Sequence, residues 1–293
     1  MNNKFRGLGV AMVTPFTNNG EVDYLALTKL TNHLIDGDVN YLVVMGTTGE
    51  NPTLDESEQR KILDSVLETN NKRLPVVFGM GGNYTQALCA KIEQYNLEGV
   101  DAILSASPYY NKPNQNGIFN HYKAVSESTD LPLIIYNVPG RTGSNIGVET
   151  TLKLAEIKNI IATKEASGNF NQCMEIIKNK PADFMVISGD DGYTLPYISC
   201  GMEGVISVIG NALPKPFSKM VNLALNGKIE EARVIHYQLF DLMNTIFEDG
   251  SPGGIKVILE KLTVCGPSMR APLYPPSESV KAKLLAKLAK FQN

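Results

Sequence analysis

The stretch NIIATKEASG, residues 159–168, decides the fold. It opens with two isoleucines, an alanine and a threonine, which suit a strand that is buried on both faces. The apolar run ends at Lys164 and Glu165, and residues 166–168 lead into a helical pattern. A buried strand followed at once by a helix is the unit of parallel α/β folds. The stretch therefore predicts a parallel sheet with a lysine at the end of one strand.

The same unit recurs along most of the 293-residue chain. Apolar runs lie at residues 8–14, 41–46, 74–79, 101–106, 131–137, 159–164, 184–189 and 204–210. Helical patterns lie between them at 23–36, 53–68, 84–96, 117–128, 148–157 and 169–178, and a capping-box pair, Thr53 and Glu56, is expected to begin the second. Strands alternating with helices in this number predict a (β/α)8 TIM barrel. The alternative is an open doubly wound sheet, but no Gly-x-Gly-x-x-Gly fingerprint follows a strand to support it.

The chain continues beyond the last apolar run with a different pattern. Residues 213–292 contain no further strand pattern and instead show helical segments separated by glycine and proline. We expect one of these helices to close the barrel as its eighth. The sequence thus predicts a catalytic barrel over residues 1–225 and a C-terminal helical region over residues 226–293 that packs on it.

Composition excludes several classes of protein. The net charge is -3, from 27 basic and 30 acidic residues that are interspersed, so neither nucleic acid nor a membrane surface is an expected partner. The apolar stretch near the N-terminus is short and runs into Pro15, unlike a signal peptide. The four cysteines lie far apart and the three histidines are isolated, so we expect no metal site and a cytoplasmic protein with reduced thiols.

Polar residues follow several of the predicted strands. The active site of a TIM barrel lies at the C-terminal ends of its strands. There the sequence has GTTGE (46–50), SPYYNKP (107–113), YNVPGRTG (136–143), Lys164 and SGDDG (188–192). In the first of these, paired glycines let N–H groups approach an anion, and Thr47 and Thr48 add hydroxyls. We therefore expect a carboxylate to bind here, although a plain tight turn has the same spacing.

Lys164, Tyr136 and Arg141 each have two interpretations. Lys164 is either a lysine that extends to solvent or pairs with an acid, or an amine that forms an imine with a carbonyl substrate. Burial favours the neutral amine, which a free lysine, with a pKa of about 10.4, rarely presents at pH 7. Tyr136 is either a core aromatic or a group that moves protons, and Arg141 is either a solvated charge or a bidentate clamp for a carboxylate.

Taken together, the motifs resemble those of a known family. The segments GVAMVTPF, GTTGE, SPYYNKP, YNVPGRTG, IATKEASG, SGDD and GVISV occur in the order found in the pyruvate-dependent class I aldolases, the family of N-acetylneuraminate lyase. The resemblance covers roughly residues 7–210, and the helical tail suits the family as well. Within the family, the sequence is similar to the branch that condenses pyruvate with L-aspartate 4-semialdehyde in lysine and diaminopimelate biosynthesis.

The resemblance implies a role for each matching residue. Lys164 would form an imine with pyruvate, Thr47 and Thr48 would hold the pyruvate carboxylate, and Tyr136 would pass protons. Arg141 would bind the carboxylate of the semialdehyde. The remaining positions are Tyr110, which with Thr47 would extend the proton relay into a neighbouring subunit's site, and Gly189 and Ile206, whose carbonyls would line the pocket. The family needs no metal or diffusible cofactor, and its usual form is a homotetramer of two tight dimers.

Two other functions remain as alternatives. N-acetylneuraminate lyase and related sugar-acid aldolases share the lysine and the tyrosine. They tend to have serine at the position of Thr47 and lack the arginine at the position of Arg141. A non-catalytic barrel that serves as a binding protein would be expected to have lost the lysine, the tyrosine or the arginine, and all three are present.

The resemblance also implies a site for feedback by lysine at the dimer interface. The matching positions are Asn51, Pro52, Glu56, Gln59, Asn83, Ala87 and Tyr109. Lysine-sensitive relatives usually carry an acidic residue at the position of Ala87 and a histidine at the position of Gln59. Without the acid, a bound amino group loses its charge partner. We therefore expect weak or absent inhibition by lysine.

Overall fold

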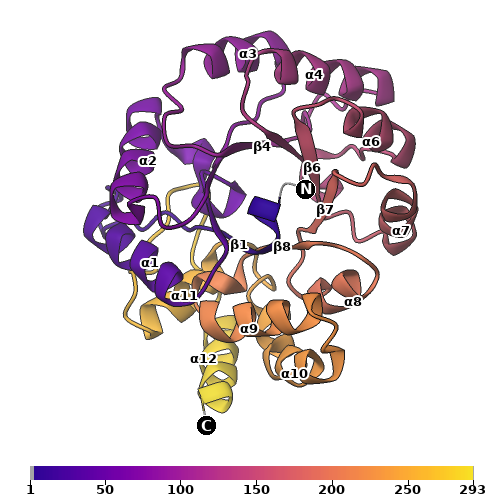
Figure 1. Ribbon diagram of the computed structural model, residues 1–293. Helices are drawn as coiled ribbons and strands as arrows, with labels where there is room; N and C mark the ends of the chain where they lie inside the picture. The colour runs from indigo at the N-terminus through magenta and orange to yellow at the C-terminus, as the bar shows by residue number, and fades with distance from the viewer. Residues whose placement is uncertain (1–2, 293) are drawn as a thin grey trace.

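Parallel strands close into a barrel in the order of the chain in the computed structural model, which describes residues 3–292. Its strands are β1 (Gly7–Ala11), β2 (Tyr41–Val44), β3 (Val76–Gly79), β4 (Ala102–Ala106), β5 (Leu133–Asn137), β6 (Ile160–Glu165), β7 (Met185–Ser188) and β8 (Gly204–Ser207). Each lies within or beside one of the predicted apolar runs, and β8 pairs with β1 to complete the circle. The predicted TIM barrel is confirmed, and Figure 1 shows it ringed by helices.

The strands are apolar on both faces because each face is buried against other apolar side chains. One cluster of buried side chains, including Val77, Ile134 and Ala162, occupies the barrel interior. A second, larger cluster lies between the strands and the helices. Phe5 and Tyr41 pack edge to face within the first cluster, with ring centroids 5.5 Å apart. Phe5 lies two residues before the start of β1, so the interior is filled at the end of the barrel where the strands begin.

The helices of the barrel follow the predicted pattern with two additions. They are α1 (Tyr24–Asp36), α2 (Glu56–Asn70), α3 (Thr85–Gln94), α4 (Gln115–Glu127), α6 (Val148–Ala155), α7 (Phe170–Asn179) and α9 (Pro214–Leu225). The additions are α5 (Pro139–Thr142), after β5, and α8 (Thr194–Ser199), after β7. Both are too short to show a helical repeat of apolar residues, which is why the sequence pattern did not reveal them.

The predicted capping box at Thr53 is wrong, because the true one lies two residues later. Thr53 belongs to a 3₁₀ turn, η3 (Asn51–Thr53), and its hydroxyl donates to the carbonyl of Glu50 at 2.8 Å. Asp55 caps α2 instead: its carboxylate accepts from the main-chain N–H of Glu58 at 2.8 Å, and the Glu58 carboxylate accepts from that of Asp55 at 3.2 Å. The pair Thr53 and Glu56 has the same spacing as the pair Asp55 and Glu58 and overlaps it in the sequence, which explains the error.

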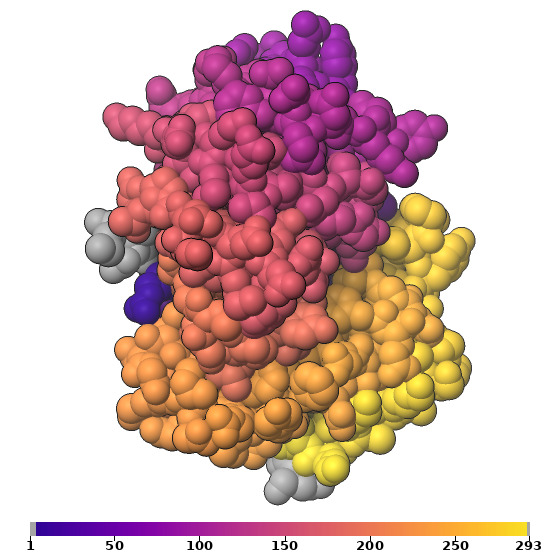
Figure 2. All heavy atoms as spheres, turned by 90° about the vertical axis from the view of Figure 1, so that its right-hand side faces the viewer, coloured from indigo at the N-terminus to yellow at the C-terminus, as the bar shows by residue number. Residues whose placement is uncertain are grey.

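The C-terminal helices extend the barrel on one side. Helix α9 packs against β1 and β8 and thus serves as the eighth helix of the barrel. It is followed by α10 (Ile229–Thr245), α11 (Gly253–Lys261) and α12 (Glu278–Gln292), with α10 against α8 and α9, and α12 against α10 and α11. Figure 2 shows this region, in orange and yellow, as a continuous layer. The domain boundary at residue 225 stays a prediction. Among residues 3–292, none of the helices is both long and apolar enough to cross a bilayer.

Candidate active site

A cavity of about 390 Å³ lies at the C-terminal ends of the strands. Six of the residues singled out in the sequence line it: Thr47, Thr48, Tyr136, Arg141, Lys164 and Gly189. They come from β5, β6 and the segments that follow β2, β5 and β7. Side chains of α10 and the segment after it, among them Phe240, Asn244 and Phe247, form the facing wall. The fold therefore brings together groups that lie between positions 47 and 251 of the chain.

Lys164 projects into the barrel interior from the end of β6. It lies opposite Tyr136 in the register of β5 and β6, and shares a face of the strand with Ala162, which packs in the interior. Only 6% of the residue is exposed, and Nζ lies 4.2 Å from the centroid of the Tyr136 ring. Burial lowers the pKa of the Lys164 amine to about 8; Asp191 opposes this shift, and Arg141 adds to it. About one molecule in ten then has the neutral amine at pH 7, against about one in two thousand for a free lysine.

Tyr136 is held beside this amine as a neutral phenol. Burial raises its pKa to about 12, and nearby Arg141 and a hydrogen bond with Thr47 act in the opposite direction. At pH 7 the hydroxyl therefore keeps its proton and can both donate and accept a hydrogen bond. Tyr136 and Lys164 line the same cavity, which suits proton transfer to and from a group bound to the amine.

The GTTGE turn is a tightly held loop between β2 and α2. Residues Thr47–Gly49 form a 3₁₀ turn, η2, in which the N–H of Gly49 donates to the carbonyl of Gly46 at 3.0 Å. The hydroxyl of Thr14 donates to the carbonyl of Gly49 at 2.6 Å. Thr48 is buried, whereas Thr47 is exposed at the edge of the cavity. Together these bonds hold the two threonine side chains at the mouth of the barrel, where an anion can reach them.

Arg141 lies on α5, directly after β5, at the exposed edge of the cavity. The turn begins at Pro139, and the N–H of Arg141 donates to the carbonyl of Val138 at 2.9 Å. Arg141 also lines a second, adjoining cavity of about 310 Å³, which shares Thr47, Tyr136 and Val138 with the first. A guanidinium here, on the solvent side of Lys164, is placed to receive the carboxylate of an incoming molecule.

Gly189, Ile206 and Tyr110 lie in three different surroundings. Gly189 stands so close to Lys164 that a Cβ atom at this position would be 3.1 Å from Cε of the lysine. Ile206 is buried within β8, in the interior cluster of the barrel. Tyr110 is 88% exposed, with φ of 72°, and is not among the residues that line either cavity. The single chain therefore does not bring Tyr110 to the amine.

The positions singled out for lysine binding lie partly at the adjoining cavity, which Asn51, Pro52 and Tyr109 line. Nε2 of Gln59 donates to Oδ1 of Asn51 at 2.8 Å. The remaining positions are Glu56, the first residue of α2, Asn83, in the loop after β3, and Ala87, which is exposed on α3.

Glu165 faces away from Lys164, as strand alternation predicts. Its buried carboxylate accepts from Nδ2 of Asn137 at 3.0 and 3.1 Å, from Nε2 of Gln172 at 3.2 Å and from the N–H of Ser167 at 2.8 Å. These bonds join β5, β6 and α7 on the outer face of the barrel. Glu165 thus fixes the position of the end of β6, which carries Lys164, and it does not line the cavity.

Two features near the site escaped the sequence analysis. Asp191 is buried, and its carboxylate accepts from the N–H groups of Val208 and Ile209, at 3.0 and 2.8 Å to Oδ2, while burial raises its pKa to about 6. The motif SGDD already marked this strand end but did not distinguish its two acids. The aromatic wall formed by Phe240 of α10 and Phe247 of the segment after it left no local signal, because only the packing of the C-terminal helices places it over the barrel.

Comparison with known proteins shows which family, sequences and solved structures the chain is similar to. Residues 4–291 match the sequence model of the family described as the dihydrodipicolinate synthetase family. A 4-hydroxy-tetrahydrodipicolinate synthase from Parabacteroides distasonis is 51% identical over 271 residues, which cover 92% of this chain and 91% of the relative. The crystal structure of dihydrodipicolinate synthase from Aquifex aeolicus is 39% identical, with a TM-score of 0.94 and 98% of each chain covered. A structure described as the first monomeric dihydrodipicolinate synthase variant is 37% identical, with a TM-score of 0.96 and coverage of 99% of this chain and 97% of that one.

Proposed function

Since the chain belongs to the dihydrodipicolinate synthetase family, we propose that Lys164 carries the family reaction, in which pyruvate condenses with L-aspartate 4-semialdehyde to give 4-hydroxy-tetrahydrodipicolinate. This lyase-class condensation in lysine and diaminopimelate biosynthesis follows from family membership; the assignment of residues to steps is our proposal. One observation carries it. The amine of Lys164 is buried 4.2 Å from the ring centroid of Tyr136, in a cavity that Thr47, Thr48 and Arg141 also line.

The first half of the reaction attaches pyruvate to the enzyme. The pyruvate carboxylate binds at Thr47 and Thr48, with its keto carbon facing Lys164. The neutral amine attacks this carbon, and Tyr136 donates a proton to the oxygen as the carbinolamine forms. Loss of water gives the imine, in which nitrogen replaces the keto oxygen. Removal of a methyl proton then gives the nucleophilic enamine.

The second half joins the two substrates. Arg141 binds the carboxylate of L-aspartate 4-semialdehyde and places its aldehyde next to the enamine. The enamine carbon attacks the aldehyde, and a proton neutralises the resulting alkoxide. The amino group of the semialdehyde then attacks the imine carbon, which closes the ring and releases Lys164. None of these steps requires a metal or a diffusible cofactor, and the covalent intermediate predicts ping-pong kinetics.

We propose that the active form is a homotetramer of two dimers in the cytoplasm. The exposed position of Tyr110 supports such an assembly. Its side chain lines neither cavity of its own chain, so it is available to extend the proton relay of a second copy. A large aromatic side chain that is almost fully exposed suits an interface. Sedimentation velocity and activity measured over a dilution series test this: a monomer with full activity contradicts it.

Borohydride reduction in the presence of pyruvate, followed by peptide mass mapping, tests the proposed function. We expect a reduced pyruvyl adduct on Lys164 and turnover when L-aspartate 4-semialdehyde is added. N-acetylneuraminate is the substrate of the alternative reaction and serves as the comparison. Absence of the adduct from Lys164 rejects the mechanism, and cleavage of N-acetylneuraminate without turnover of the semialdehyde rejects the assigned substrate.

For Arg141→Ala we expect KM for the semialdehyde to rise about 10- to 100-fold, while trapping of the pyruvate imine persists. The reason is that a charge-assisted bidentate pair contributes about 1.5–3 kcal/mol, and in the proposed mechanism Arg141 binds only the second substrate. Arg233→Ala is the matched control, since Arg233 is a surface arginine paired with Glu230 on α10. Steady-state kinetics with each substrate varied separately measure the effect. An unchanged KM for the semialdehyde contradicts the role of Arg141.

Free lysine is expected to inhibit weakly or not at all. Ala87 offers no carboxylate, and the neighbouring acceptors already bind Lys91, whose Nζ lies 3.1 Å from Oε1 of Gln59 and 3.2 Å from Oε1 of Glu56. An incoming amino group would have to displace this side chain. Initial rates measured over a lysine titration test the expectation, and half-inhibition by sub-millimolar lysine refutes it. Ala87→Glu should increase the sensitivity by supplying the missing charge.

A further inference from the structure

The last residue of the GTTGE turn, Glu50, is a buried carboxylate that is bound to the C-terminal region. Its side chain and that of its ion-pair partner, Lys256 on α11, are both completely inaccessible to solvent. Besides Oε1 of Glu50, Nζ of Lys256 donates to the carbonyl of Thr14 at 2.8 Å and to that of Ser268 at 2.7 Å. All three donors of the ammonium are therefore used. The pair joins the substrate turn to a helix that lies more than 200 residues further along the chain.

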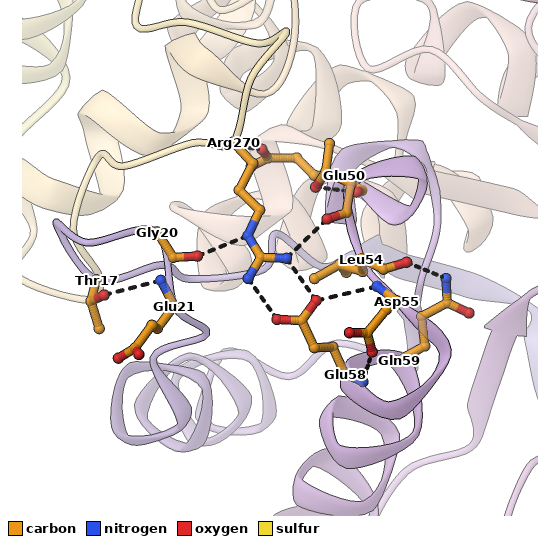
Figure 3. Close-up of polar contacts among 10 residues, drawn as sticks. Thr17, Gly20, Glu21, Glu50, Leu54, Asp55, Glu58, Gln59 and Arg270 are labelled. Atoms are coloured by element: carbon orange, nitrogen blue, oxygen red, sulfur yellow. Dashed lines mark hydrogen bonds and ion pairs between the residues drawn. The ribbon is translucent and has the colours of Figure 1, made fainter.

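Arg270 attaches the same turn from a second side. Its main-chain N–H donates to Oε2 of Glu50 at 3.1 Å, so both carboxylate oxygens are bound. Its guanidinium pairs with both oxygens of Glu58 on α2, at 2.6 and 2.7 Å, and also donates to the carbonyls of Gly20 and Thr53. Figure 3 shows Arg270 between Gly20, on one side, and Glu50 and Glu58, on the other. The loop after α11 thus holds the segment that follows Thr47 and Thr48.

The backbone at Glu50 needs such an anchor. Glu50 has φ of 56°, a left-handed conformation that side-chain-bearing residues rarely adopt unless the surroundings enforce it. In that conformation its N–H donates to the carbonyl of Thr47 at 3.1 Å, and its own carbonyl accepts from the Thr53 hydroxyl at 2.8 Å. A change in the conformation of Glu50 would therefore alter the turn in which Thr47 and Thr48 lie.

We propose that Glu50 is a positioning residue for pyruvate, and that Lys256 and Arg270 make the C-terminal region part of the substrate site. The carboxylate holds the turn in the form in which Thr47 and Thr48 border the cavity of Lys164. This inference rests on the proposed role of those threonines in binding pyruvate. Stability alone is a poor reason for the arrangement, because apolar residues can often replace a buried ion pair without loss.

Glu50→Gln tests the proposal against a matched control. The variant keeps the shape of the side chain but removes the charge that Lys256 and Arg270 bind. The control is Glu203→Gln at the opposite end of the barrel, where Glu203 pairs with Lys180 at 2.8 Å and accepts from the N–H of Val186. Both variants lose one carboxylate from a lysine pair, and only the first adjoins the substrate turn. The measurements are thermal unfolding and the pyruvate concentration that gives half-maximal trapping of the imine by borohydride.

We expect Glu50→Gln to raise the half-maximal pyruvate concentration at least fivefold, and Glu203→Gln to leave it within twofold even if it lowers Tm. A rise of less than fivefold in Glu50→Gln, or an equal rise in the control, overturns the proposal. If Glu50→Gln does not fold, the double variant with Lys256→Met, which leaves no unpaired buried charge, is judged by the same threshold. Wild-type protein that traps no pyruvate on Lys164 instead rejects the proposed function, so the two failures are distinguishable.

Discussion

Lys164→Met is expected to abolish the pyruvyl adduct and to lower kcat about a thousandfold or more. The covalent route requires a nucleophilic nitrogen, and no other residue of the cavity can replace it at this position. Methionine is close to lysine in length and fills the same space beside Ala162 and the Tyr136 ring. Because the variant also removes a buried amine that is costly to charge, we expect Tm to be unchanged or higher. Stopped assays measure kcat, mass mapping after borohydride treatment measures the adduct, and thermal unfolding measures Tm.

The pH dependence of imine formation in the wild-type protein tests the lowered pKa of Lys164. With the pKa of Lys164 at about 8, the neutral amine increases about tenfold for each pH unit up to that value and then levels off. The rate of imine formation with pyruvate should follow the same curve. Lys164→Arg controls for the charge, since it keeps a cation but not the nucleophile. Full activity in Lys164→Met would instead support the interpretation of Lys164 as a structural lysine.

Tyr136→Phe is expected to lower kcat about 10²- to 10⁴-fold, the range typical for loss of a general acid–base group. Phenylalanine keeps the ring that lies 4.2 Å from Nζ of Lys164, so packing around the amine is preserved and the proton carrier alone is lost. Imine trapping should become slower, but it should still reach completion at long incubation times. Single-turnover kinetics with pyruvate separate this effect from binding.

Tyr122→Phe is the control for Tyr136→Phe. Tyr122 is fully buried in the outer core, its hydroxyl donates to the carbonyl of Ser105 at 2.9 Å, and it lines neither cavity. We expect this variant to lose some thermal stability and to retain kcat. A Tyr136→Phe enzyme with the kcat of the wild type would show that the proton takes another path.

The strands and the site residues at their ends were predictable because their signals are local. A strand that is covered on both faces must be apolar along its length, and the stretch NIIATKEASG has this character up to Lys164. Alternation within such a strand also separates Lys164, which faces the interior, from Glu165, which faces the helices. Elements with only one or two turns, such as α5 and α8, have no repeat long enough to recognise.

The sequence by itself determined the barrel, its order of strands and the edge where Thr47, Tyr136, Arg141 and Lys164 gather, because burial periodicity and strand direction dictate these features. Tertiary structure alone decided the burial that lowers the pKa of the Lys164 amine, the α10 wall of the cavity and the bond between Glu50 and Lys256. These depend on contacts between segments that are far apart in the chain. Such contacts follow from how whole elements pack together, which no short stretch of sequence encodes.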